Sequence, residues 1–231
     1  MNFTVNRLSG AGGAEVRGLD LSQPIGDNLA QDLRQAWLDH GGIMVVRDQH
    51  LSSEQHIAFA RHFGPLFGAP GESPLQDTVS RYIHPDYPEL YRVSNKLDET
   101  GEPLGRARAG TYWHSDVSFR ERPAAASILY AREIPPIGGD TLFANMTLAY
   151  EALSDGLKAM LAPLYAVHDF AVAAATQYAR PIVVETDMDG ANRARHPIVR
   201  THAETGAKSL FVNPGFTLGI DGFTKVCKVS N

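Results

Sequence analysis

The sequence predicts a mainly β protein, a sandwich or barrel with a few helices on its outer face. After Thr111, short runs rich in β-branched and aromatic residues are separated by turn residues, which is typical of many short strands. These runs do not alternate with long helical segments, so a βαβ fold is disfavoured. The expected strands span residues 112–119, 127–134, 141–144, 164–170, 197–202 and 208–212, and short helices are expected at residues 147–153 and 155–161.

Two longer helices are expected near the N-terminus. Asp27 is a good N-cap for the first helix, and Gly41 ends it. The second helix begins with Ser52 and Gln55 at the spacing of a capping box. Between the helices, the apolar run at residues 43–46 predicts a short buried strand. Because each helix has one apolar face, both are expected to pack on the outside of a sheet.

The segment 66–110 is rich in Gly, Pro, Asp and Glu, and it shows clear strand character only at residues 90–94. A stretch this long with little regular structure is unusual in a compact domain and indicates a functional loop or lid. A solvated surface excursion is an equally good interpretation of the same composition.

Composition and charge exclude several classes of protein. The 231 residues are 43% hydrophobic and 20% charged, as in ordinary globular proteins, and the net charge of −5 argues against a general nucleic-acid binder. The single cysteine, Cys227, excludes an internal disulfide framework and a cysteine-rich zinc site. No apolar run is long enough for a membrane span or a signal peptide. We expect one cytoplasmic domain over residues 1–231, with neither a nucleic acid nor a membrane as partner.

The segment Thr-Tyr-Trp-His-Ser-Asp-Val-Ser-Phe, residues 111–119, carries the strongest chemical pattern. On a strand, side chains alternate between the two faces, so His114 and Asp116 would project from the same face. An imidazole and a carboxylate at this spacing can bind one metal ion. With a second histidine they form the facial triad of non-haem Fe(II) oxygenases. A hydrogen-bonded His–Asp pair on a polar strand explains the same tripeptide.

Several blocks of the sequence resemble, in the same order, the TauD/TfdA family of Fe(II)- and 2-oxoglutarate-dependent dioxygenases. They are residues 111–119, the Pro-rich continuation at 121–154, the RHPIVRTHAETGAKSLFVNPGF block at 195–216, the RHFGPL block at 61–66 and the helix–strand–helix pattern of 28–63. The resemblance extends to about Phe223. It implies a double-stranded β-helix, a jelly-roll of two sheets with the metal between them, with flanking helices.

The resemblance also implies roles for particular residues. His114 and Asp116 would be the first two Fe(II) ligands, and Thr141 would bind the carboxylate of 2-oxoglutarate, with O2 as the second cosubstrate. Without the family, Thr141 is an ordinary β-branched strand residue that follows the Gly138-Gly139 turn.

Other polar residues have less specific interpretations. His196, Arg200 and His202 are interpreted as structural hydrogen bonders, because the family block that contains them does not use these histidines as metal ligands. Arg106 and Arg108 precede the metal segment and could meet an anionic substrate. The favoured interpretation of each is a solvated loop charge.

The resemblance breaks down in several places. Gly110 stands where taurine-specific relatives carry an asparagine that contacts substrate, which argues against taurine itself. The family's third ligand, a C-terminal histidine, and the arginine ten or eleven residues after it are not found. The residues after Phe223 do not resemble the family's continuation, so we expect a jelly-roll that lacks its last strands. Open sheet edges of that kind predict poor solubility or a homo-oligomer that covers them.

The resemblance implies an oxidoreductase that hydroxylates a small organic substrate, a sulfonate or an aryloxy or alkyl acid, with release of succinate and CO2. One alternative is a catalytically inactive truncated remnant, or an interaction subunit of the same fold, which would account for the missing C-terminal motif. A second alternative is a zinc-dependent hydrolase that uses His114 and Asp116 and produces no succinate.

Overall fold

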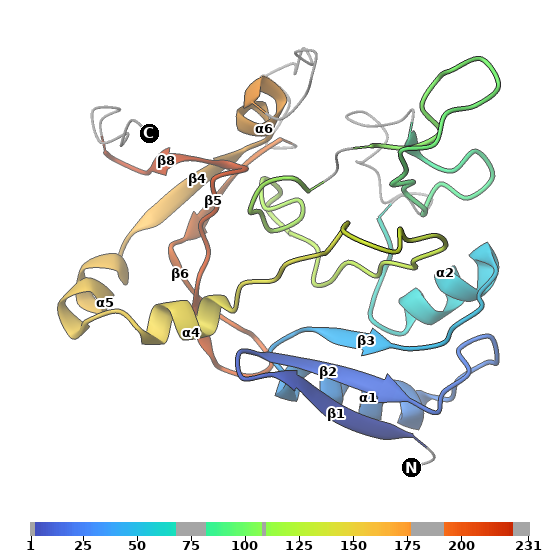
Figure 1. The fold of residues 1–231 in the computed structure, drawn as a ribbon. Helices are drawn as coiled ribbons and strands as arrows, with labels where there is room; N and C mark the ends of the chain where they lie inside the picture. The colour runs from blue at the N-terminus through green and yellow to red at the C-terminus, as the bar shows by residue number, and fades with distance from the viewer. Residues whose placement is uncertain (1–2, 68–81, 108–109, 177–191, 224–231) are drawn as a thin grey trace. The chain divides into compact units, whose positions relative to one another are not determined.

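The computed structural model describes residues 3–67, 82–107, 110–176 and 192–223 (Figure 1). The chain divides into two compact units. The first contains Met1–Ala107 and Ile128–Asn145, and the second contains Arg108–Ser127 and Met146–Asn231. Each unit is described here by itself, and the single domain expected from the sequence stays a prediction.

The first unit is built on a three-stranded sheet of order β1-β2-β3. Strands β1 (Thr4–Ser9) and β2 (Gly12–Arg17) form an antiparallel hairpin, and β3 (Met44–Val46) pairs with β2 in parallel. Helix α1 (Asp27–Asp39) makes the crossover from β2 to β3, and α2 (Ser53–Arg61) follows β3 (Figure 1). The apolar run before α2 is therefore a strand, as expected, although its side chains are only half-buried.

The core of the first unit joins the hairpin to the helices. Its fully buried side chains include Val16 of β2 and Leu33 of α1, which pack with Leu51 and Phe59. The hairpin was not predicted, because its short polar strands carry few β-branched residues. Gly12 shows why the turn needs glycine: its φ is +123°, and a Cβ there would lie 2.8 Å from the carbonyl oxygen of His40.

The boundaries of the two helices test the capping predictions. Asp27 lies inside the first turn of α1 and is not its N-cap, because Gly26 occupies that position and makes no side-chain cap hydrogen bond. The capping box of α2 is confirmed. The Ser52 hydroxyl accepts from the Gln55 N–H at 3.3 Å, and the Gln55 side-chain oxygen accepts from the Ser52 N–H at 2.7 Å.

Replacing Ser52 with Ala is expected to lower the free energy of unfolding by about 1 kcal/mol, because the first turn of α2 loses its side-chain acceptor. Thermal unfolding should shift down by roughly 2–4 °C. Ser53→Ala, one residue later, is the control, because it removes a hydroxyl from the same turn without removing the N-cap. Equal shifts for the two variants would contradict the capping role.

The described residues of the second unit form two small antiparallel sheets. Strand β4 (Tyr165–Asp169) is central in the first, between β5 (Arg193–Pro197) and β8 (Thr217–Ile220). Strands β6 (Val199–Thr201) and β7 (Lys208–Leu210) form the second. Strands were expected around β4, β6 and β7, whereas β8 was not expected.

The described residues of the second unit include three short helices. Helices α4 (Met146–Glu151) and α5 (Asp155–Leu161) lie where the sequence predicts helices, and Ser154 caps α5 as its hydroxyl accepts from the Leu157 N–H. Helix α6 (Phe170–Thr176) was not predicted. No helix among the described residues is long and apolar enough to cross a membrane.

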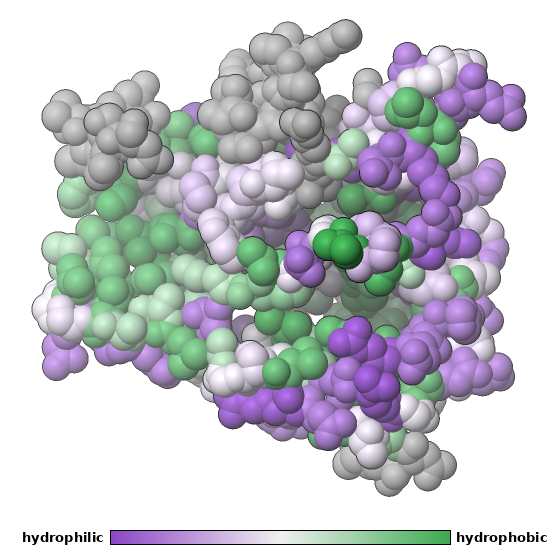
Figure 2. Space-filling model, viewed as in Figure 1, coloured by the Kyte–Doolittle hydropathy of each residue, from purple (hydrophilic) through white to green (hydrophobic). Residues whose placement is uncertain are grey.

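Apolar side chains gather on the surface that carries α4 and α5 (Figure 2). Leu148, Leu157 and Met160 are exposed there. A contiguous apolar surface is typical of an interaction face. The homo-oligomer expected from the sequence stays a prediction.

The strands expected at residues 112–119, 127–134 and 141–144 are corrected by the structure, which has turns, bends and irregular chain there. In the first of these segments the cause is backbone conformation, because Val117 has a φ of +47°, which no extended strand accommodates. The third segment follows Gly138 and Gly139, whose φ values of +79° and +75° turn the chain just before it. The strand expected at residues 90–94 is reduced to one bridge between Ile83 and Tyr91.

Candidate metal centre

His114 and Asp116 lie in the second unit, where the chain turns sharply after Ser115. Although the segment is not a strand, the two side chains converge, and His114 Nε2 lies 3.0 Å from Asp116 Oδ1. The histidine is mostly covered and the carboxylate is half exposed. The pair therefore stays accessible to a small ion from one side.

The imidazole of His114 is oriented by the backbone. Its Nδ1 lies 2.8 Å from the carbonyl oxygen of Tyr112. A carbonyl oxygen only accepts, so Nδ1 carries the proton and donates it. The lone pair of Nε2 is then directed toward Asp116, an arrangement found in metal-binding histidines, which usually donate their other ring N–H to a carbonyl or carboxylate.

The carboxylate of Asp116 is held from its other side. Its Oδ2 accepts a hydrogen bond from the Ser127 hydroxyl. The residue between the two halves of the turn, Val117, is a β-branched residue in the left-handed region, with a φ of +47°. Such a conformation persists only where the surrounding structure holds it, and it is often found at functional sites.

The donor set fits a divalent metal ion. Two donors that each lie about 2.1 Å from one ion, at about a right angle, are about 3.0 Å apart. His114 Nε2 and Asp116 Oδ1 are 3.0 Å apart. An imidazole nitrogen and a carboxylate oxygen are also the ligand types of non-haem Fe(II) sites. Among the residues that the structure describes, no three His, Cys, Asp or Glu side chains are grouped so as to hold a metal ion.

Aromatic and glycine residues form the wall behind His114. Its ring is 4.9 Å from the Tyr112 ring and 6.0 Å from the Phe216 ring, edge to face with the latter. Gly215 allows this packing, because a Cβ there would lie 2.4 Å from Tyr112 Cε2 and 3.1 Å from His114 Cβ. Gly110 also borders the imidazole, since its Cβ would lie 3.4 Å from His114 Cε1. The sequence offered no signal for Gly215.

Two buried histidines lie beneath this turn. His168 of β4 is fully buried, and its ring packs edge to face against His196 of β5, with centroids 5.4 Å apart. His196 Nε2 lies 2.9 Å from the Arg120 carbonyl oxygen, a structural hydrogen bond of the kind expected from the sequence. His168 was not singled out, because a lone histidine in an apolar run carries no spacing signal.

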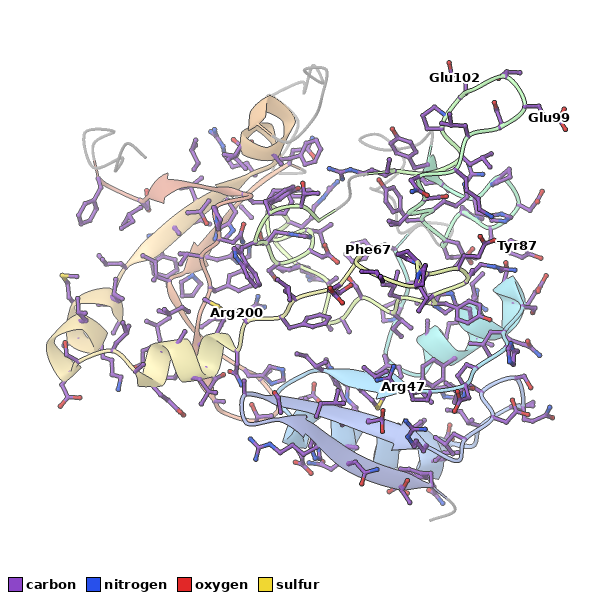
Figure 3. The ribbon with its side chains drawn as sticks, viewed as in Figure 1. Arg47, Phe67, Tyr87, Glu99, Glu102 and Arg200 are labelled. Atoms are coloured by element: carbon purple, nitrogen blue, oxygen red, sulfur yellow. The ribbon has the colours of Figure 1, made fainter. Side chains whose placement is uncertain are left out.

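The remaining polar residues of this block make local contacts. Arg200 lies over the ring of Phe211, with its guanidinium carbon 4.7 Å from the ring centroid (Figure 3). His202 Nδ1 accepts hydrogen bonds from the N–H groups of Glu204 and Thr205, both at 3.3 Å. Both residues serve the local structure around β6 and β7.

Burial, together with the charge of the nearby His196, lowers the pKa of His168 to about 4. In the unfolded chain the same histidine has a pKa near 6.5. Between pH 4 and 6.5, the unfolded chain therefore binds this proton and the folded chain does not. Lowering the pH from 7 to 5 is therefore expected to reduce the free energy of unfolding by about 2 kcal/mol through this one group. Urea titrations at both pH values measure the difference. His168→Gln should flatten the pH dependence, whereas an equally steep dependence in that variant would contradict the assignment.

The other residues that the sequence singled out lie elsewhere. Thr141 belongs to the first unit, on an exposed irregular segment after Gly138 and Gly139, and its role stays a prediction. Arg106 also belongs to the first unit, where its N–H donates to the Arg92 carbonyl oxygen at 3.0 Å. Arg108 lies outside the described residues.

Comparison with known proteins relates the whole chain to one family. The model of the family described as "Taurine catabolism dioxygenase TauD, TfdA family" matches residues 4–226. The alpha-ketoglutarate-dependent 2,4-dichlorophenoxyacetate dioxygenase of Cupriavidus pinatubonensis is 36% identical over 92% of this chain and 74% of its own length. A putative alpha-ketoglutarate-dependent sulfonate dioxygenase of Schizosaccharomyces pombe is 33% identical over 92% of this chain, which spans 51% of that protein.

Solved structures give the same relationship. The crystal structure of a taurine dioxygenase from Burkholderia xenovorans matches with a TM-score of 0.73 and 34% identity, covering 97% of this chain and 68% of that one. The structure of AAD-2 in complex with Mn(II) and N-oxalylglycine matches with a TM-score of 0.70 and 25% identity, covering 96% and 73%. These likenesses confirm the jelly-roll fold class. The chain belongs to the TauD/TfdA family, whose members are 2-oxoglutarate-dependent dioxygenases that use Fe(II) and O2.

Proposed function

We propose that this chain binds Fe(II) through His114 and Asp116 and uses 2-oxoglutarate and O2 to hydroxylate a small organic anion. The observation that carries the proposal is the convergence of His114 Nε2 and Asp116 Oδ1 at 3.0 Å, with both side chains fixed from behind. Bound Fe(II) would supply the activation of O2, coupled to the conversion of 2-oxoglutarate to succinate and CO2.

The residues of the chain orient and hold the reacting groups. Tyr112 fixes the His114 imidazole through its carbonyl, so that Nε2 presents a lone pair without further rotation. Ser127 donates a hydrogen bond to Oδ2 of the Asp116 carboxylate and leaves Oδ1 directed at the histidine. The Tyr112 and Phe216 rings keep water from the rear of the imidazole.

The substrate class follows from the chemistry that the relatives share. The proteins in Cupriavidus pinatubonensis and Sphingobium herbicidovorans are described as acting on 2,4-dichlorophenoxyacetate and (S)-phenoxypropionate, and the one in Schizosaccharomyces pombe as a sulfonate dioxygenase. Each of these molecules is a small anion with a carboxylate or sulfonate group. We propose the same class of substrate for this chain.

The test is succinate formation by the purified chain supplied with Fe(II), 2-oxoglutarate, O2 and ascorbate, in the presence of a panel of aryloxyalkanoates and alkyl sulfonates. The proposal expects at least one panel member to raise succinate release above the rate without substrate. Metal binding without any substrate-dependent succinate would contradict the proposed reaction. Hydrolysis of a panel member in the presence of Zn(II), with no succinate, would favour the hydrolase alternative.

Thr141→Val is expected to raise the KM for 2-oxoglutarate about tenfold or more, because the variant keeps the shape of the side chain but removes a hydrogen bond to a charged carboxylate. The control is Thr4→Val, which makes the same change on exposed strand β1. The KM is measured from succinate release at saturating substrate. An unchanged KM would remove Thr141 from the cosubstrate site.

A further inference from the structure

The turn that carries His114 and Asp116 is connected to the sheet beneath it by a buried polar side chain. Ser118 is fully buried, two residues after Asp116, and its hydroxyl lies 3.0 Å from His168 Nδ1 and 3.2 Å from Asn213 Nδ2. Removing a fully buried hydroxyl with two polar partners would leave each partner without this hydrogen bond, and unsatisfied buried polar groups are costly.

The direction of each hydrogen bond follows from its partners. His168 Nε2 faces the carbonyl oxygen of Phe211 at 3.2 Å, so this nitrogen donates. The neutral imidazole then accepts at Nδ1, and the Ser118 hydroxyl donates to it. The Asn213 side-chain N–H donates to the same hydroxyl oxygen. The Ser118 hydroxyl thus donates one hydrogen bond and accepts another, which fixes the orientation of its side chain.

Asn213 links this point to the wall behind His114. Its side-chain oxygen accepts from the Phe216 backbone N–H at 2.8 Å, and its backbone N–H donates to the Thr217 hydroxyl at 2.9 Å. The Phe216 ring packs edge to face against the His114 ring. Asn213 therefore fixes both the turn after Asp116 and the aromatic ring against His114.

The strained residue lies between Asp116 and Ser118. Val117, at a φ of +47°, has an unfavourable backbone that relaxes unless its neighbours are held in place. On one side the Asp116 carboxylate is bonded to Ser127, and on the other side Ser118 is bonded to His168 and Asn213. Loss of the Ser118 hydrogen bonds would free one end of this turn.

We propose that Ser118, His168 and Asn213 are positioning residues that hold the strained turn at Val117, and thereby keep His114 Nε2 and Asp116 Oδ1 at the separation that one metal ion requires. The inference rests on the proposed metal site of His114 and Asp116. It assigns to the three residues an effect on metal affinity that is distinct from their effect on stability.

The experiment measures the dissociation constant for Mn(II) by titration in the full chain, next to the free energy of unfolding. Ser118→Ala is expected to raise the dissociation constant about tenfold or more, as for other residues that orient metal ligands. The matched control is Ala166→Gly, which weakens buried strand β4 without a hydrogen bond to the turn. The positioning role is overturned if Ser118→Ala and Ala166→Gly lower stability equally and bind Mn(II) equally well.

A second variant tests the strain directly. Val117→Asn places a residue that tolerates the left-handed region at the strained position. In the Ser118→Ala background, this change is expected to restore most of the lost Mn(II) affinity. A double variant that binds Mn(II) as weakly as Ser118→Ala alone would contradict the role of strain.

A metal-free readout separates this inference from the proposed function. If the unaltered chain binds no Mn(II), the metal site of His114 and Asp116 is wrong. The positioning role is then read from the 15N resonances of the His114 ring without metal. Wild type and Ala166→Gly are expected to give one sharp set, and Ser118→Ala a broadened or second set. Identical His114 resonances in all three proteins would overturn the positioning role.

Discussion

Replacing Asp116 with Ala is expected to abolish metal-dependent succinate formation and to weaken Fe(II) binding by about 100-fold or more. Partners that only orient a metal ligand contribute 10–100-fold to affinity, so the loss of a ligand should cost at least the upper end of that range. The same change removes the acceptor of the Ser127 hydrogen bond. This loss is expected to lower the free energy of unfolding by about 1 kcal/mol. Metal affinity and unfolding free energy are therefore measured on the same samples.

The control for this prediction is His202→Ala. His202 is exposed and lies in the same unit, and its Nδ1 accepts hydrogen bonds from the Glu204 and Thr205 N–H groups of its own turn. It should retain both Fe(II) affinity and succinate formation within about twofold of wild type, since surface changes have small effects. An Asp116→Ala variant that binds Fe(II) as well as His202→Ala does would contradict the metal site.

Gly215→Ala has the second-largest expected effect, although Gly215 contacts no reacting group. The added Cβ would lie 2.4 Å from Tyr112 Cε2, and a ring carbon in a packed wall cannot move aside as a flexible chain end can. Tyr112 must shift, and its carbonyl carries the hydrogen bond that orients His114. Because a misplacement near 1 Å can cost about 100-fold in rate, we expect succinate formation to fall by 10- to 100-fold.

Gly219→Ala is the matched control for this change. Gly219 lies in β8 of the same unit, and nothing would lie within 4 Å of its added Cβ. The Gly219→Ala variant measures how much replacing a glycine in this region changes metal affinity and rate when no clash is introduced. The metal dissociation constant and the rate of succinate release should both change for Gly215→Ala and stay near wild type for Gly219→Ala. Equal behaviour of the two variants would show that the Tyr112 wall does not position His114.

The parts of the fold that the sequence predicts well are those fixed by local interactions. The capping box at Ser52 and Gln55 requires only residues three apart, and helix α5 begins after a serine cap. The β1–β2 hairpin escaped prediction because its stability comes from Val16 packing against Leu33, a contact between distant segments. Its glycine-rich turn at Gly12 was the available signal.

For the candidate site, the sequence predicts which two side chains lie together, but not the backbone conformation that brings them together. The alternation argument for His114 and Asp116 assumed a strand, and the left-handed backbone at Val117 makes it a turn. The side chains converge all the same, because residues two apart can meet in a turn as well as on one strand face. The sequence could not reveal His168, since its hydrogen bond to Ser118 joins residues 50 apart.

The central claim is that one metal ion binds both His114 and Asp116, and the most direct test is pulsed EPR of the chain loaded with Mn(II). A coordinated imidazole gives a nitrogen modulation of the electron spin echo. We predict this modulation in the unaltered chain and in His196→Gln, whose imidazole is engaged with the Arg120 carbonyl oxygen. We predict its loss in His114→Gln, in a sample matched for bound Mn(II). Nitrogen modulation that persists in His114→Gln and disappears in His196→Gln would place the metal on the other histidine and contradict the account.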